Sequence, residues 1–200
     1  MQKDKITARI ENFNSVSRNG DDKDIFVELI FCILTPQSKA KSCWTAVENL
    51  LKSELLWKGT QAQIVNELNG VRFKYKKAKY IIEARKKFFN RIPLKSTIDD
   101  FPDNIETRDY IVENIKGIGY KEASHFLRNV GRGQNLAILD RHILKNLVLF
   151  NVIKEVPDFI SKNRYFDIEE KMIKFSNKIK IPVSHLDLLF WSKETGEIFK

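Results

Sequence analysis

One stretch of the chain, residues 112–144, constrains the fold more than any other, because two glycine-rich turns divide it into three short helical segments. The first turn is Gly117–Gly119, and Lys121 follows it at once. The second turn contains Gly131, and Asp140 follows that loop nineteen residues after Lys121. The pattern predicts helix, hairpin, helix, loop and helix, with Lys121 in the first turn of the second helix and Asp140 opening the third.

The hairpin has the properties of a phosphate-binding turn. Gly117 and Gly119 permit backbone angles that residues with a Cβ atom resist. The helix after the turn begins with amides that lack an intrahelical partner, and these donors and the helix dipole favour an anion. Gly117, Gly119 and Tyr120 are the candidate phosphate contacts. An ordinary interpretation stays open here, since Gly-x-Gly turns are common, a first-turn lysine is usually solvated, and Asp140 is also a good N-cap.

The rest of the chain shows helical periodicity and no sustained period-two alternation, which predicts an all-α protein of roughly ten helices. An apolar helix over Ile25–Leu34 is expected to be buried, and Asp22 or Asp24 can cap it. It should end before Pro36, because proline disfavours helix in the preceding residue. Ser38 can cap the helix that follows.

The charge of the chain points to an anionic partner. The formal net charge is +9, which favours either nucleic acid or an anionic membrane surface. A predicted helix over Val71–Arg91 carries a dense basic face that could contact phosphates, although an ordinary lysine-rich surface has the same composition. The cations of this basic face are Arg72, Lys74, Lys76, Lys77, Lys79, Arg85, Lys86, Lys87 and Arg91.

The sequence also bears on compartment and on metals. No apolar run is long enough to span a bilayer, and the N-terminus lacks the apolar core of a signal peptide, so we expect a cytoplasmic protein without a membrane partner. Cys32 and Cys43 lie in apolar helical patterns and are expected to be free core thiols. Two cysteines cannot hold a four-cysteine iron–sulfur cluster, and the three scattered histidines do not predict a structural zinc site.

Two further residue types could carry chemistry. Gln37 lies in a polar loop beside the basic residues Lys39 and Lys41 and could insert into a DNA duplex, although a solvated loop glutamine is the ordinary interpretation. Lys121 could act as a nucleophile. An amine attacks only when neutral, and a free lysine has a pKa of about 10.4; a helix N-terminus and burial both disfavour the ammonium form. Asp140 could take the proton or stabilise positive charge on the substrate.

These parts predict one coherent reaction. A lysine nucleophile, a phosphate-binding hairpin and a basic chain suit attack on C1′ of a nucleotide in DNA. The base leaves, a covalent imine forms, and elimination of the 3′ phosphate nicks the strand. An enzyme of this kind must first turn the base out of the helical stack.

At Ile118–Lys121 and Leu139–His142 the sequence resembles the helix-hairpin-helix DNA glycosylases, which carry a Gly/Pro-rich loop and an aspartate. Within that superfamily it is most similar to the short 8-oxoguanine DNA glycosylase/lyases. The resemblance covers nearly the whole chain, and its most specific parts are KGIGYKEASHFLRNVG and the tail FWSKETGEIFK. It implies a two-lobed all-α fold with the active site between the lobes. The expected lobes are residues 22–132 and residues 1–21 with 133–200.

The resemblance also implies roles for individual residues. Lys121 would be the Schiff-base nucleophile and Asp140 the assisting acid. Gln37 matches the loop that enters the duplex, and Trp191 and Lys200 would contact the oxidised base. A monovalent cation, K⁺ or Na⁺, would bind at the hairpin through the main-chain carbonyls of three residues, which by position are Glu113, Ile115 and Ile118.

The expected activity is therefore excision of 8-oxoguanine from double-stranded DNA by a monomer that needs no other cofactor. The loop between Lys121 and Asp140 is one residue longer than is usual in the family. The missing four-cysteine cluster distinguishes the chain from many endonuclease III relatives. Two alternatives remain: an endonuclease III-like enzyme for another damaged base, and a non-catalytic helix-hairpin-helix DNA-binding module.

Overall fold

The computed structural model describes residues 2–89 and 92–200, and all regular secondary structure in these two ranges is helical, as predicted. The chain divides into two compact units. One unit is Asn19–Phe126, and the other combines Met1–Arg18 with Leu127–Lys200. The boundaries therefore lie between residues 18 and 19 and between residues 126 and 127, a few residues before those expected from the sequence.

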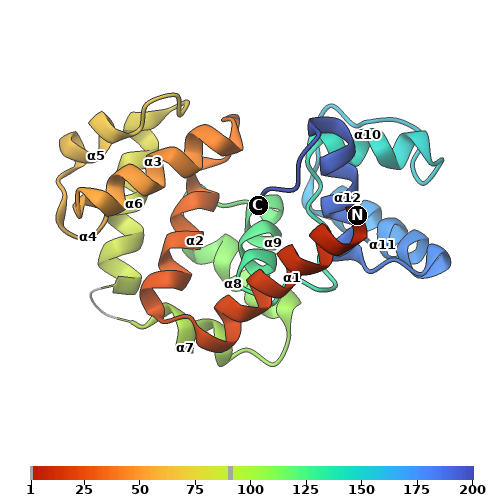
Figure 1. The fold of residues 1–200 in the computed structure, drawn as a ribbon, viewed down its shortest axis with the longest axis horizontal. Helices are drawn as coiled ribbons and strands as arrows, with labels where there is room; N and C mark the ends of the chain where they lie inside the picture. Colours follow the sequence, from red (N-terminus) through yellow and green to blue (C-terminus); the bar gives the residue numbers. More distant parts are fainter. Residues whose placement is uncertain (1, 90–91) are drawn as a thin grey trace. The chain divides into compact units, whose positions relative to one another are not determined.

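The 19–126 unit is built around the apolar helix α2 (Asp22–Leu34). Phe26, Leu29 and Ile30 of α2 are almost completely buried, because helices contact it on several sides. Figure 1 shows α3 and α6 beside α2 and α7 near its N-terminal end. The other helices of this unit are α3 (Ala40–Lys52), α4 (Leu55–Lys58), α5 (Gln61–Glu67), α6 (Lys74–Ala84), the π-helix η1 (Arg85–Phe89), α7 (Leu94–Asp99) and α8 (Asn104–Asn114), and α9 (Tyr120–Asn129) begins in it.

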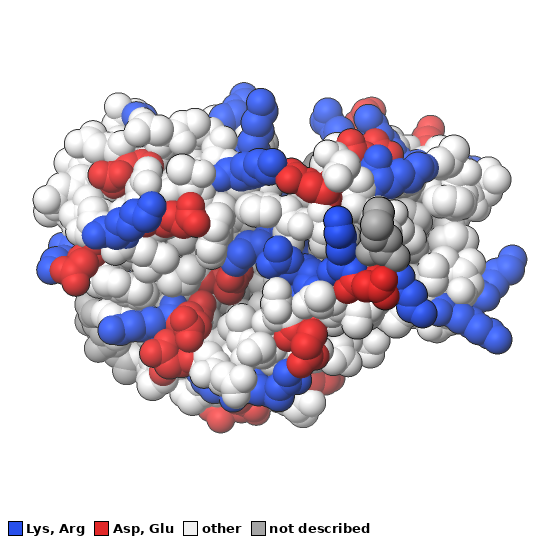
Figure 2. Space-filling view, viewed as in Figure 1, with Lys and Arg blue, Asp and Glu red and all other residues white. Residues whose placement is uncertain are grey.

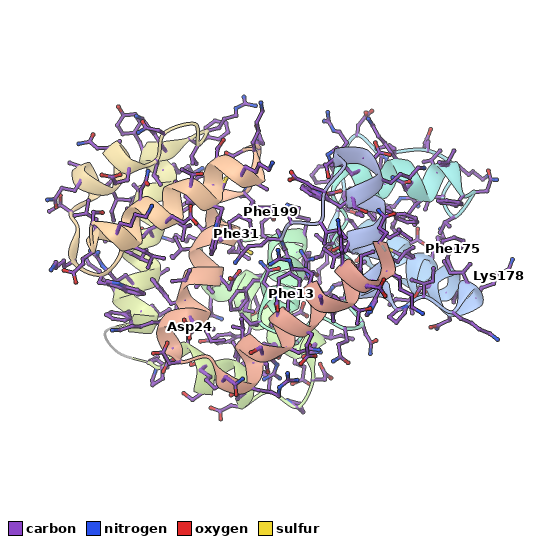
Figure 3. All side chains as sticks on the ribbon, viewed as in Figure 1. Phe13, Asp24, Phe31, Phe175, Lys178 and Phe199 are labelled. Atoms are coloured by element: carbon purple, nitrogen blue, oxygen red, sulfur yellow. The ribbon has the colours of Figure 1, made fainter. Side chains whose placement is uncertain are left out.

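The start of α2 corrects one expectation. The residue that caps α2 is Asp21, whose side chain accepts hydrogen bonds from the Lys23 and Asp24 amides at 2.8 and 3.0 Å. Asp24, labelled in Figure 3, completes a capping box by accepting the Asp21 amide at 3.1 Å. Asp22 instead accepts the Lys95 amide of α7 at 2.8 Å. The predicted end of α2 before Pro36 is confirmed.

The helix predicted over Val71–Arg91 is shorter and less regular than its periodicity suggests. It begins at Lys74, because Phe73 adopts a left-handed conformation with φ 58°, and after Ala84 the backbone continues as the π-helix η1. Arg91 lies outside the described residues. A π-helical turn inserts one extra residue per turn, so the face predicted from a regular 3.6-residue period rotates beyond residue 84.

The other unit contains most of α1 (Gln2–Asn19), the end of α9, α10 (Arg141–Leu149), α11 (Lys162–Ile179) and α12 (Val183–Thr195). Helix α12 packs against α10 and α11. Phe13 of α1, labelled in Figure 3, packs in an apolar cluster with Ile6 and Leu188. The guanidinium of Arg128 lies over the Phe13 ring and forms a buried ion pair with Asp187 at 3.3 Å. Within the described residues, no helix is both long and apolar enough to cross a bilayer.

Candidate active site

The predicted hairpin is present in the 19–126 unit. Helix α8 ends at Asn114, the backbone of its C-cap Ile115 is extended, and α9 begins at Tyr120. Gly117 has φ +87°, and a Cβ atom there would collide with the ring of Tyr80. Glycine is therefore required at residue 117 both by its backbone conformation and by a close contact. Gly119 does not adopt a positive φ, so the expectation that both glycines use this freedom is wrong for Gly119.

Lys121 lies in the first turn of α9, as predicted, and its side chain is 26% exposed. Its Nζ is 3.5 Å from Oε1 of Glu122. The other carboxylate oxygen of Glu122 accepts the Gly119 amide at 3.3 Å. The sequence patterns considered above do not single out Glu122. The signal that could have found it is the capping-box spacing, in which an N-cap residue such as Gly119 is followed three residues later by Glu.

Gln37 lies in the turn between α2 and α3. It is exposed and adopts φ +55°, a left-handed conformation that is uncommon for a residue with a side chain. Ser38 does not cap α3, contrary to expectation, because α3 begins at Ala40 without a side-chain cap. The Ser38 hydroxyl instead accepts the Arg72 amide at 3.0 Å. Contacts from outside the turn therefore hold it in place.

Lys77 of α6 is the main contact of this turn. It is buried, and its Nζ donates to the carbonyls of Leu34 and Pro36, each at 2.7 Å, and to Ser38 Oγ at 3.0 Å. Burial lowers the pKa of Lys77, and the charges of Glu122 and Lys121 also act on it. Lys77 thus links the Gln37 turn to the part of the unit that carries Lys121.

We expect Lys77→Met to lower the free energy of unfolding by about 2 kcal/mol, because the variant keeps the apolar volume but removes the charged donor shared by the Leu34 and Pro36 carbonyls. Urea unfolding measures this loss. The matched control is Lys79→Met on the same helix, where the side chain is exposed and the change should stay within about 0.5 kcal/mol. Equal effects of the two variants would show that Lys77 does not hold the turn.

Asp140 is the N-cap of α10, as the ordinary interpretation predicts. Its Oδ1 accepts the Ile143 amide at 2.8 Å, and the residue remains partly exposed. The cap uses Oδ1, which is one of the two carboxylate oxygens of Asp140. Asp140 belongs to the unit that includes residues 127–200, whereas Lys121 belongs to the 19–126 unit.

The C-terminal residues named from the sequence lie in the same unit as Asp140. Helix α12 stops at Gly196, which has φ +81°. The rings of Trp191 and Phe199 stack with centroids 6.5 Å apart and planes 28° apart, and Phe199 is labelled on the final segment in Figure 3. Lys200 follows directly and is partly exposed. The structure therefore brings the tail next to Trp191.

The predicted basic face is not uniformly exposed. Lys77 is buried, and Arg85 donates to the carbonyls of Leu55, Leu56 and Gly59 inside the fold. The assignment of Lys77 to a surface face is therefore wrong, whereas Arg85 is partly exposed and its guanidinium stabilises the 19–126 unit. In the view of Figure 2, Lys and Arg side chains are interspersed with Asp and Glu side chains.

The cysteines are free and buried, as predicted. Burial raises the pKa of Cys43 to about 11, and its Sγ donates to the Leu34 carbonyl at 3.1 Å. The thiol is therefore neutral near pH 7 and serves as a donor to the end of α2. In the described ranges no group of three or more His, Cys, Asp or Glu side chains could hold a metal ion.

The chain is similar to proteins of a known family. A family model described as 8-oxoguanine DNA glycosylase matches residues 6–181. An 8-oxoguanine DNA glycosylase/AP lyase of Fusobacterium nucleatum is 50% identical over 194 residues, which cover 96% of this chain and 89% of the relative.

Solved structures agree with the sequence comparison. The 8-oxoguanine glycosylase/lyase of Methanocaldococcus jannaschii in complex with a 15mer DNA containing 8-oxoguanine superposes with a TM-score of 0.90 and 36% identity, covering 99% of this chain and 93% of that one. A 3-methyladenine DNA glycosylase of H. pylori gives a TM-score of 0.60 at 15% identity over 98% of this chain and 99% of that one, which shows a shared fold alone.

Proposed function

The chain belongs to the 8-oxoguanine DNA glycosylase family, and on that premise we propose that it excises 8-oxoguanine from double-stranded DNA and nicks the strand at the resulting abasic site. The observation that carries the proposal is the position of Lys121. An amine in the first turn of α9, directly after the Gly117 turn, suits a Schiff-base nucleophile.

The proposed reaction uses Lys121 and Asp140 in different roles. The neutral amine of Lys121 attacks C1′ as the bond from C1′ to the base breaks, and the resulting amine adduct opens to an imine. Asp140 stabilises the positive charge that develops on the sugar, since a carboxylate aimed at a developing charge lowers the barrier. Loss of a proton from C2′ then expels the 3′ phosphate and leaves a nicked strand.

Binding of the substrate involves the residues around the two helix starts. Gly117, Gly119 and Tyr120 form the hairpin that approaches a phosphate, because a helix N-terminus favours an anion. The main-chain donors to the phosphate are proposed at Gly117 and Tyr120, since the Gly119 amide donates to Glu122. Gln37 is exposed at the tip of a braced turn and is suited to fill the space that the displaced base leaves. Trp191 and Lys200 contact the oxidised base.

A monovalent cation is proposed at the hairpin, held by the main-chain carbonyls of Glu113, Ile115 and Ile118. The extended backbone of Ile115 ends α8, so carbonyls of its last turn lack the donors that a continuing helix would supply. Carbonyl oxygens are suitable ligands for K⁺ or Na⁺. The Ile115 carbonyl also accepts the Ile118 amide at 3.4 Å, a long hydrogen bond that leaves room for a second partner. When bound, the cation would help order the turn.

Because the proposed substrate is DNA, we propose that the protein works in the cytoplasm, at the chromosome. We also propose that it works as a monomer. Gel filtration coupled to light scattering, with and without a lesion-containing duplex, tests the monomer. A dimer in both states would overturn that part of the proposal.

A nicking assay on duplexes that each carry one lesion tests the function. The set contains 8-oxoguanine, an oxidised pyrimidine, an alkylated purine and an abasic site, with borohydride added in parallel to trap an imine. We expect cleavage and trapping with 8-oxoguanine and with the abasic site. Preferential action on the oxidised pyrimidine would favour an endonuclease III-like enzyme, and binding without cleavage would indicate a non-catalytic module.

We expect deletion of Lys200 to slow release of 8-oxoguanine about 10- to 100-fold while sparing cleavage of a preformed abasic site, because one charged hydrogen bond to the base contributes about 1.5–3 kcal/mol. Single-turnover rates on the two duplexes measure the difference. Lys178→Ala removes a charge from an exposed position on α11, labelled in Figure 3, and is the control. Equal loss on both duplexes would exclude a specificity role for Lys200.

A further inference from the structure

The carboxylate of Glu122 contacts two groups of the hairpin with its two oxygens. Oε2 accepts the Gly119 amide at 3.3 Å, which caps the start of α9. Oε1 lies 3.5 Å from Nζ of Lys121, and the Glu122 side chain is only 15% exposed. The first contact caps the start of α9, and the second places the carboxylate beside the amine.

Two residues of neighbouring helices interact electrostatically with members of this pair. Lys77 of α6 is a buried cation whose charge interacts with both Glu122 and Lys121. Cys43 of α3 interacts electrostatically with Lys121, but its pKa of about 11 keeps the thiol protonated and excludes it as a base near neutral pH. Glu122 is the group in this cluster that can accept a proton.

We propose that Glu122 is a catalytic residue that accepts the proton of the Lys121 ammonium and so produces the neutral amine that attacks C1′. This proposal rests on the nucleophile role of Lys121 given above. One proton moves from Nζ to Oε1, leaving a neutral amine and a carboxylic acid. The bond between Nζ and C1′ then forms as the bond from C1′ to the base breaks, and the departing base takes a proton from the new secondary ammonium.

The two carboxylates, Glu122 and Asp140, then have different roles in the proposed reaction. Glu122 directly follows the nucleophile in the first turn of α9, and its rotamer brings Oε1 to 3.5 Å from Nζ. Asp140 is then left to stabilise charge on the sugar. Because both excision and cleavage of an abasic site begin with a neutral amine, loss of Glu122 should affect both activities, whereas loss of Lys200 should affect excision alone.

The decisive variant is Glu122→Gln. Glutamine is accepted at this position of a capping box and can keep the hydrogen bond from the Gly119 amide, so the fold and DNA affinity should be preserved. It cannot take a proton. We expect the single-turnover rate of borohydride trapping at pH 7 to fall about 100-fold with 8-oxoguanine and with abasic duplexes.

The pH dependence distinguishes proton transfer from capping. In Glu122→Gln the proton must pass to solvent, so the deficit should be largest at acidic pH and shrink as the pH rises and hydroxide becomes available. A deficit that is the same from pH 6 to pH 9 would mean that Glu122 only shapes the helix start. Glu122→Asp, which keeps a carboxylate one methylene shorter, should recover part of the rate.

Controls separate failure of this inference from failure of the proposed function. Glu106→Gln makes the same change in the first turn of α8, where the side chain is exposed, and should keep the full trapping rate. If Glu122→Gln traps normally while Lys121→Gln does not, the nucleophile stands and the role of Glu122 is overturned. If Lys121→Gln also traps, the proposed function itself loses its nucleophile.

Discussion

Lys121→Gln is expected to abolish covalent trapping of the protein on 8-oxoguanine DNA in the presence of borohydride. A glutamine amide cannot form an imine, and no step of the proposed reaction proceeds without that bond. The change should leave the fold intact, because glutamine is a good helix former and the lysine side chain is 26% exposed. Denaturing gels reveal the trapped species, and nicking of the same duplex should disappear with it.

The appropriate control is another lysine of the same hairpin. Lys116 lies in the turn, is 70% exposed and pairs with Glu83 at 3.2 Å. Lys116→Gln should still be trapped at enzyme concentrations that saturate the DNA. DNA affinity, measured by fluorescence anisotropy, should be similar for Lys121→Gln and the unchanged protein. Normal trapping by Lys121→Gln would remove the nucleophile assignment, and a parallel loss of DNA binding would leave a positioning role only.

Asp140→Asn should slow release of the base about 100- to 1,000-fold with little change in DNA affinity. Asparagine is as good an N-cap as aspartate, so the hydrogen bond from the Ile143 amide and the start of α10 should persist. What the variant loses is the negative charge that would stabilise the developing cation on the sugar. Single-turnover excision and anisotropy, measured on the same duplex, give the two quantities.

A second N-cap provides the matched comparison for Asp140. Asp103 caps α8 through hydrogen bonds from the Ile105 and Glu106 amides at 2.8 and 2.9 Å. Asp103→Asn makes the same chemical change at an exposed helix start and should not alter excision. If Asp140→Asn weakens DNA binding and spares the chemistry, the residue is a cap and contributes nothing further.

Several features could be predicted from the sequence because they depend on neighbouring residues. Helical periodicity predicts the all-α class, and Pro36 predicts the end of α2. The Gly117 turn and the helix starts at Tyr120 and Arg141 also follow from short-range signals. The family resemblance then connects Lys121 and Asp140 to a reaction, and comparison with known proteins confirms the family.

Other features depend on contacts between distant residues or on the rotamer of one side chain. Lys77 is one of nine cations in its stretch, and only packing against the end of α2 shows that it is buried and braces the Gln37 turn. The carbonyl contacts of Arg85 are hidden in the sequence for the same reason, since its partners lie 26 to 30 residues away.

For the stretch at residues 112–144, the sequence by itself determined the helix starts and the two residues assigned to the chemistry. Only the tertiary structure decided what Lys121 contacts. The sequence pattern of a first helical turn allows the side chain of Glu122 to point to solvent, to the Gly119 amide or to the amine, because several rotamers are open to it. In the structure the hairpin packs against α6 through Gly117 and Tyr80, and the carboxylate faces both the amide and the amine.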